Sequence, residues 1–213
     1  MTLSSRAAGY YSKMDGKTKL GDLRNMAKEI KKDHELALEL WSVGEFLPRQ
    51  LAILIMDPKK MTQEVVNQLD SDIQQHPFSE RIHLIDWLMV NQLAKDKKAK
   101  ELMLSWQNSP SALQRRIFWY HQARLRWVGQ TPPPNSEELM KAIEATIEQE
   151  APEVQWAMNF TAAQIGIYQP EFRARCISLG ERTGLFKDEI VAKNCTPNYL
   201  PAFITMQVAK LEK

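Results

Sequence analysis

Cysteine and histidine are scarce in this chain of 213 residues, which has two of the first and four of the second. Cys176 and Cys195 are too few for a disulfide scaffold, and no C-x-x-C motif is present. The histidines stand far apart along the chain, without the spacing of metal ligands. We therefore expect neither a metal nor another cofactor.

The sequence also lacks the motifs that mark several large enzyme classes. It has no P-loop, no G-x-G-x-x-G, no H-E-x-x-H and no G-x-S-x-G on a strand-turn-helix. No apolar run approaches the length of a membrane span, and the start does not resemble a signal peptide. These absences predict a cytoplasmic, reduced protein without a membrane partner, and we expect it to be a monomer.

Strand patterns are missing as well, since no segment alternates apolar and polar residues over several positions. The chain instead shows helical spacing interrupted by proline and glycine, which predicts an all-α fold of antiparallel helix pairs. Two helices in every ~35–45 residues match HEAT-like repeats stacked as a curved solenoid, although a compact bundle fits the same periodicity. Residues 1–18 have no usable period, so we predict a loop or mobile arm there, with room for a short helical turn, and a single HEAT-like domain over 19–213.

Start and stop signals place several of the helices. Asp33 and Thr62 have the character of N-caps, because their side chains can accept a hydrogen bond from the first helical turn. Gly44 and Gly184 are predicted helix ends. The apolar run L-A-I-L-I-M within 46–56 indicates that this helix is the most buried of all.

Charge is nearly balanced, and a net charge of +2 does not by itself indicate nucleic-acid binding. The charges are nevertheless segregated, because residues 102–136 contain no Asp or Glu. Within them, 110–128 reads P-S-A-L-Q-R-R-I-F-W-Y-H-Q-A-R-L-R-W-V and predicts one long helix. At 3.6 residues per turn, one of its faces holds Arg115, Trp119, Gln122 and Arg126.

A basic helix with aromatic residues is typical of contact with a polyanion such as DNA, which makes Arg115, Arg116, Trp119 and Arg126 candidate residues for that contact. The alternative is a half-buried helix whose arginines extend along apolar surface or pair with acids. Glu144 and Glu148 follow the proline-rich connector 131–136 and could lie against this helix.

Aromatic residues also recur beside polar residues at helical spacing. Trp87 and Asn91 are four residues apart, as are Trp156 and Phe160, so each pair shares a helix face. Exposed rings can stack on bases or sugars, which makes Trp156 a further candidate for DNA contact. The alternative is that each ring belongs to the core.

Four blocks occur in the order and spacing of a known family. L-G-D-L-R-N-M-A-K-E-I and E-L-W-S-V-G-E-F-L-P-R-Q-L-A-I-L-I lie in the first half of the chain. S-A-L-Q-R-R and P-E-V-Q-W-A-M-N-F follow in the second half. Over about residues 19–179, the chain resembles the DNA alkylation repair (AlkD-like) family.

The resemblance implies a curved stack of HEAT-like helix pairs with a basic groove for double-stranded DNA, alkylated or distorted. Active members of that family are glycosylases that remove N3- and N7-alkylated purines with two tryptophans and an aspartate, while an arginine holds the DNA backbone. By position, Trp87 matches the first tryptophan and Arg115 matches the arginine. Asn91 stands at the position of the aspartate, and Phe160 stands at that of the second tryptophan.

Asn91 is the departure with the clearest chemical meaning. A carboxylate stabilises the positive charge that builds on the sugar and can activate water, whereas an amide can hold water but brings no charge. Loss of one such contact typically costs ~10²–10³ in rate. Three hypotheses therefore stay open: a weak alkylpurine glycosylase that uses Trp87, Asn91 and Phe160, a non-catalytic DNA-binding relative, and a HEAT-like scaffold for another protein.

Overall fold

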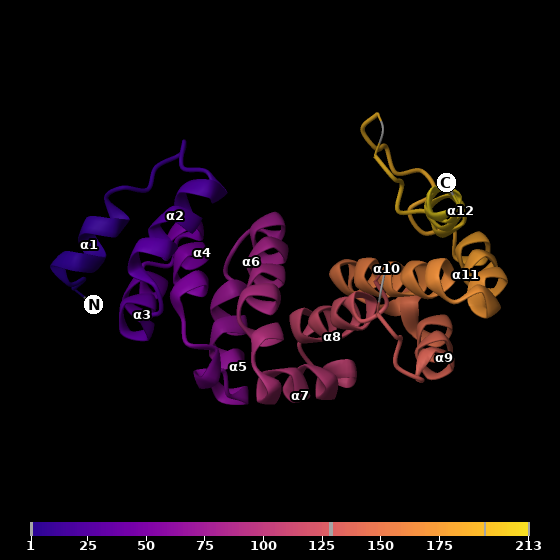
Figure 1. The fold of residues 1–213 in the computed structure, drawn as a ribbon, viewed down its shortest axis with the longest axis horizontal. Coiled ribbons are helices and arrows are strands. Elements are labelled where there is room, and N and C mark those ends of the chain that lie inside the picture. The colour runs from indigo at the N-terminus through magenta and orange to yellow at the C-terminus, as the bar shows by residue number, and fades with distance from the viewer. Residues whose placement is uncertain (1, 128–129, 194, 213) are drawn as a thin grey trace. The chain divides into compact units, whose positions relative to one another are not determined.

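The computed structural model describes residues 2–127, 130–193 and 195–212, and the regular secondary structure within these ranges is entirely helical (Figure 1). No β-strand occurs in the described ranges, so the all-α prediction is confirmed. In the same ranges, every helix is too short or too polar to cross a membrane.

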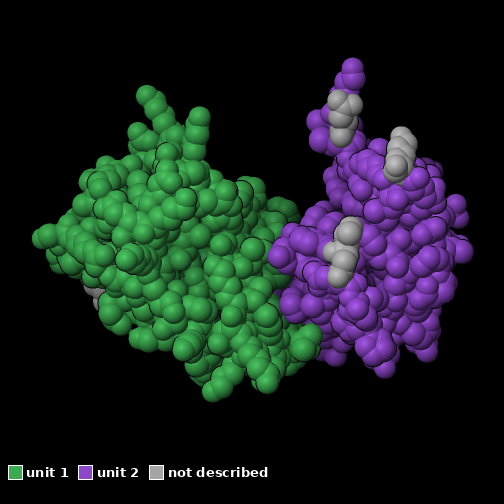
Figure 2. Space-filling model, in the orientation of Figure 1, with its two compact units in different colours: residues 1–105 green, residues 106–213 purple. Residues whose placement is uncertain are grey.

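The chain divides into two compact units, residues 1–105 and residues 106–213 (Figure 2). The first contains α1 (Ser5–Tyr11), α2 (Leu20–Ile30), α3 (His34–Ser42), α4 (Phe46–Ile55), α5 (Gln63–Ile73), α6 (Phe78–Asn91) and α7 (Lys97–Ser105). The second contains α8 (Ala112–Arg124), α9 (Ser136–Thr146), α10 (Pro152–Tyr168), α11 (Pro170–Thr183) and α12 (Leu200–Leu211). The single domain predicted over 19–213 is thus built from two compact units, and each is described by itself.

Helix α4 is the centre of the first unit. It packs against α2, α3 and α6, and Leu51, Ile53 and Ile55 are fully buried. The prediction that this apolar helix is deeply buried is confirmed. Because three helices surround it, α4 fixes the positions of the side chains that α2 and α6 present to solvent.

The predicted start and stop signals occur where the sequence places them. Asp33 accepts a hydrogen bond from the Leu36 amide at the start of α3, and Thr62 accepts one from the Val65 amide at the start of α5. Gly44 follows the end of α3 with a φ of 83°, and Gly184 ends α11 with a φ of 62°. Both values lie in the left-handed region that glycine adopts without strain.

The segment predicted as a loop or mobile arm contains helix α1. Ser4 caps this helix at the Ala7 amide, and Ala7 and Tyr10 are buried. The Tyr10 hydroxyl donates to the Glu29 carboxylate over 3.0 Å, which joins α1 to α2. Ser5–Tyr11 therefore form a helix in the segment where the sequence leaves room only for a short helical turn, because seven residues are too few to display a helical period.

Helix α10 is the centre of the second unit. It packs against α8, α9, α11 and α12, and apolar side chains around its circumference are fully buried. These side chains are Val154, Ala157, Met158, Ala162, Ala163 and Ile165. One side of its neighbour α8 is therefore buried in the core of the unit.

The contact between α11 and α12 predicts a strong effect for a small substitution. A Cβ added to Gly180 would lie 2.5 Å from Pro201 Cδ and 2.6 Å from Leu200 Cβ, so the two helices would have to separate. We expect Gly180→Ala to lower the free energy of unfolding by about 1–3 kcal/mol in urea denaturation. The control is Gly21→Ala on α2, where nothing lies within 4 Å of the added atom. Unchanged stability in Gly180→Ala would contradict the close packing.

His34, at the start of α3, predicts a pH dependence of stability. Burial lowers its pKa from 6.5, the Lys60 ammonium lowers it further, and Glu35 and Asp57 oppose the change. The folded protein therefore binds this proton more weakly than the unfolded chain, so stability is lost as the pH falls below 6.5. We expect the melting temperature to fall between about pH 7 and pH 5, and to fall less in His34→Gln. The same dependence of melting temperature on pH in the wild-type protein and in His34→Gln would contradict this role of His34.

Candidate nucleic-acid interface

Trp87 lies half-buried on α6 in the first unit, with its indole held in a fixed orientation. The indole Nε1 donates to the Gln50 carbonyl on α4 over 3.2 Å. Asn91 lies one turn later, and its amide Nδ2 donates to the Trp87 carbonyl over 2.9 Å. The two residues thus share a partly exposed face of α6, but the Asn91 side-chain amide is directed toward the backbone of the preceding helical turn.

The guanidinium of Arg24, a residue that the sequence analysis did not select, lies over the Trp87 ring. Its guanidinium carbon lies 5.3 Å from the centre of the Trp87 ring. The Arg24 side chain is exposed, and among the described residues it has neither an ion pair nor a hydrogen bond. A cation–π contact of this kind contributes only about 0.5–1 kcal/mol at an exposed site. Arg24 is therefore oriented by the ring while its donors stay available.

Arg115, the predicted DNA-backbone residue, is engaged within the second unit. Its Nη2 donates to a Glu150 carboxylate oxygen over 2.8 Å, and its Nε contacts both oxygens at 3.1 and 3.2 Å. Its Nη1 donates to the carbonyls of Ser109 and Pro110. The two charged side chains are only 19% and 17% exposed, so each partner neutralises the other at a shielded site.

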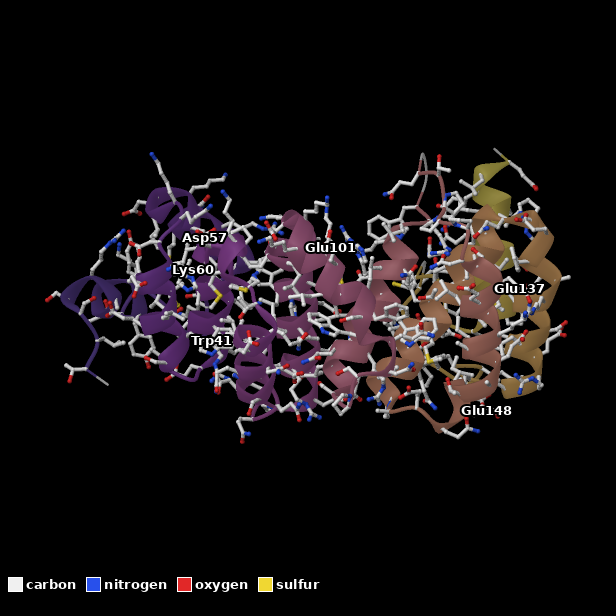
Figure 3. All side chains as sticks on the ribbon, turned by 90° about the horizontal axis from the view of Figure 1, so that it is seen from below. Trp41, Asp57, Lys60, Glu101, Glu137 and Glu148 are labelled. Carbon is white, nitrogen blue, oxygen red and sulfur yellow. The ribbon has the colours of Figure 1, made fainter. Side chains whose placement is uncertain are left out.

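The acids expected to face the arginine helix pair elsewhere. Glu144 bonds to Arg175 on α11 at 2.7 Å, which lowers the pKa of the carboxyl group. Glu148, labelled in Figure 3, bonds to Arg182 at 2.9 Å. The pairing predicted for this helix does occur, but Glu150 supplies it.

The predicted polar face of α8 is largely interior. Trp119 is 2% exposed and Gln122 is buried, since α8 packs against α10 along its length. Thr161 on α10 donates to the Trp119 carbonyl over 2.6 Å. Arg116 is also buried, with Nη1 donating to the Glu153 carbonyl over 2.8 Å. We therefore correct the interpretation of Trp119 and Arg116 from DNA contacts to core residues, because helix packing removes both from solvent.

Arg126 is the most deeply buried of the predicted DNA-binding residues, at 1% exposure. Its guanidinium donates to the Gln122 carbonyl over 2.8 Å, to Asn135 Oδ1 over 2.5 Å and to Ser136 Oγ over 3.0 Å. Burial lowers the pKa of Arg126 to about 10. This arginine joins the end of α8 to the start of α9, and the DNA contact expected of it is corrected to a structural role.

Trp156 and Phe160 lie together, as their spacing predicts, but in an aromatic cluster. Their rings stack at 5.2 Å with 9° between the planes. The edges of Tyr120 and Phe203 approach Phe160 at 5.7 and 6.0 Å, and the Arg116 guanidinium lies 4.6 Å from the centre of Trp156. Three aromatic neighbours surround Phe160, so its ring is occupied in packing within the second unit.

The first unit therefore holds an exposed cation on an aromatic ring, whereas the predicted cations of the second unit are paired or buried. The sequence contained one signal for Arg24, because Arg24 and Lys28 are four residues apart on α2. Within the described ranges, no group of three or more His, Cys, Asp or Glu side chains is placed to bind a metal ion.

The protein is thus an all-α protein of packed helix pairs, in which the Arg24 guanidinium lies over the half-buried ring of Trp87. The sequence model of the DNA alkylation repair enzyme family matches residues 18–181. The chain belongs to this family, and the resemblance described above is confirmed.

Two other proteins are also similar to this chain. The uncharacterized protein Lin0241 of Listeria innocua is 23% identical over 168 residues, which cover 78% of this chain and 71% of that protein. A solved structure is described as representing a new family of proteins related to the HEAT-like repeat DNA glycosylases with affinity for branched DNA structures. The match covers 99% of this chain and 89% of the chain in the solved structure, with a TM-score of 0.61 at 19% identity. This likeness confirms the HEAT-like repeat fold.

Proposed function

We propose that this protein binds DNA through the phosphate backbone and does not act as an efficient alkylpurine glycosylase. The observation that carries the proposal is the Arg24 guanidinium 5.3 Å from the centre of the Trp87 ring, next to a neutral Asn91. A cation at this place attracts a phosphate and repels a cationic alkylated purine.

The chemistry of excision supports the same conclusion. An N3- or N7-alkylated purine is already positively charged, and its departure leaves positive charge on the sugar. A carboxylate would stabilise that charge, whereas Arg24 destabilises it and the Asn91 amide donates to a backbone carbonyl. Any residual excision of alkylated purines is expected to be ~10²–10³ slower than with a placed carboxylate.

The comparisons support DNA as the partner and refine the kind of DNA. The chain belongs to a DNA repair family, and the protein with a similar fold is described as having affinity for branched DNA structures. We infer that branched or otherwise distorted duplex DNA is the preferred ligand, recognised by shape rather than by base sequence.

A binding titration tests the proposal. The full-length protein is titrated against a fluorescently labelled duplex and a four-way junction of the same total length, at salt concentrations from about 50 to 200 mM. We expect both to bind, the junction more tightly, with affinity falling linearly on a double-logarithmic salt plot. No binding to either DNA at the lowest salt would overturn the proposal and favour a HEAT-like scaffold for another protein.

A further inference from the structure

Three exposed cations lie on α2 or directly after its end. Arg24 and Lys28 are four residues apart, so their side chains project from the same side of α2, and Lys31 follows directly after the helix with a φ of 65°. None of the three has an ion pair with another described residue. We call these three residues the α2 basic stripe.

The acids of α2 do not neutralise this stripe. The Asp22 carboxylate accepts a hydrogen bond from the Lys19 amide over 2.8 Å, and Glu29 accepts one from the Tyr10 hydroxyl over 3.0 Å. Both acids also lie roughly 140–160° around the helix from Arg24. The positive charge of the stripe is therefore directed away from the acids of its own helix.

The α2 basic stripe stands on a rigid support. Leu23 and Ile30 bury the other side of α2 against α4, and α4 also supplies the Gln50 carbonyl that holds the Trp87 indole. Because α4 holds both the Trp87 indole and helix α2 in place, Arg24 is oriented before any ligand binds. Preorganisation of this kind reduces the entropy lost when a side chain is immobilised in a complex.

We propose that the α2 basic stripe binds one strand of the DNA backbone and that Arg24 is its anchoring residue. The inference rests on the proposed function and adds the position of the phosphate contact. The four-residue step from Arg24 to Lys28 extends about 6 Å along the helix, and phosphates recur every ~3.4 Å of axis along one strand, so these two cations span about two phosphates. Arg115 does not provide this contact, because Glu150 and two carbonyls occupy its donors.

The test compares the salt dependence of DNA binding in single variants of the full-length chain. Arg24→Ala is expected to reduce the slope of log affinity against log salt by about 0.9, which corresponds to roughly tenfold weaker binding near 0.1 M salt. Lys28→Ala is expected to act in the same direction, and Arg24→Lys should retain the wild-type slope because the charge remains. Arg115→Ala should change the slope by less than Arg24→Ala.

Arg81 provides the matched control. It lies on α6, the helix of Trp87, and its guanidinium likewise lies over an aromatic ring, 5.6 Å from the centre of Phe78. Arg81→Ala removes the same charge from the same unit and is expected to leave the slope unchanged. Equal losses in Arg81→Ala and Arg24→Ala would overturn the proposal, because the effect would then follow net charge.

Failure of this inference can be distinguished from failure of the proposed function. If the wild-type protein binds DNA and both Arg24→Ala and Lys28→Ala keep its slope, only the α2 basic stripe is refuted. If the wild-type protein does not bind DNA, both proposals fall. Far-ultraviolet circular dichroism identifies any variant that has lost its fold, and Lys28→Ala keeps the test decisive since Lys28 is exposed and forms no ion pair with a described residue.

Discussion

Arg126→Ala is expected to lower the free energy of unfolding by about 3 kcal/mol. The substitution removes the donor that the buried Gln122 and Ser136 and the half-buried Asn135 share, and it opens a cavity at the junction of α8 and α9. Each buried polar group that loses its partner costs about 1–3 kcal/mol. Removal of the Arg126 charge also removes the free-energy penalty of burying it, which offsets part of this cost. Urea denaturation followed by circular dichroism measures the difference.

Arg124 supplies the control for this experiment. It is only half-buried near the end of the same helix, and its guanidinium lies 4.5 Å from the centre of the Trp127 ring. Arg124→Ala should cost about 1 kcal/mol, because a single cation–π contact outside the core contributes little more than that. If both variants lose the same stability, the buried hydrogen bonds of Arg126 do not hold α8 to α9.

The second large effect concerns excision of alkylated bases. Asn91→Asp combined with Arg24→Ala is expected to increase release of N7-methylguanine by on the order of 10²-fold over the wild-type protein. The first change supplies a carboxylate at the family position, and the second removes the cation that opposes a charged base on Trp87. Release is measured with excess protein, so that weaker DNA binding in the double variant does not mask the chemical step.

The single variants divide this effect between its two causes. Asn91→Asp alone should gain less than the double variant, because the Arg24 guanidinium still faces the Trp87 ring. Arg24→Ala alone should gain little, since no carboxylate is present at position 91. A full gain from Asn91→Asp alone would show that Arg24 does not influence the reaction, and the electrostatic argument for Arg24 would be wrong.

Much of the fold could be predicted from the sequence, because helices and their ends depend on neighbouring residues. Asp33 and Gly184 mark helix boundaries through local hydrogen bonds and local backbone conformation. The burial of α4 follows from an apolar run within ten residues. Helix α1 escaped prediction because tertiary contacts such as Tyr10 with Glu29 stabilise a helix too short to be recognised from its own sequence.

The candidate site was harder to predict, because exposure is not a local property. The basic helix 110–128 appeared to present Arg115 and Arg126 to a polyanion, yet Glu150 pairs with the first and packing buries the second. Glu150 lies 35 residues from Arg115, so sequence spacing could not reveal the pair. Arg24 was overlooked for the same reason, since its significance depends on Trp87, 63 positions away in the chain and adjacent in space.

One measurement tests the central claim most directly: release of free base from DNA that is already bound. A duplex carrying N7-methylguanine is saturated with excess wild-type protein at low salt, binding is verified by fluorescence anisotropy, and free N7-methylguanine is quantified over time. The predicted result is that base appears at the rate seen without protein while the DNA remains bound. Release far above that rate from the bound complex, abolished by Trp87→Ala, would contradict the account and identify the protein as an active glycosylase.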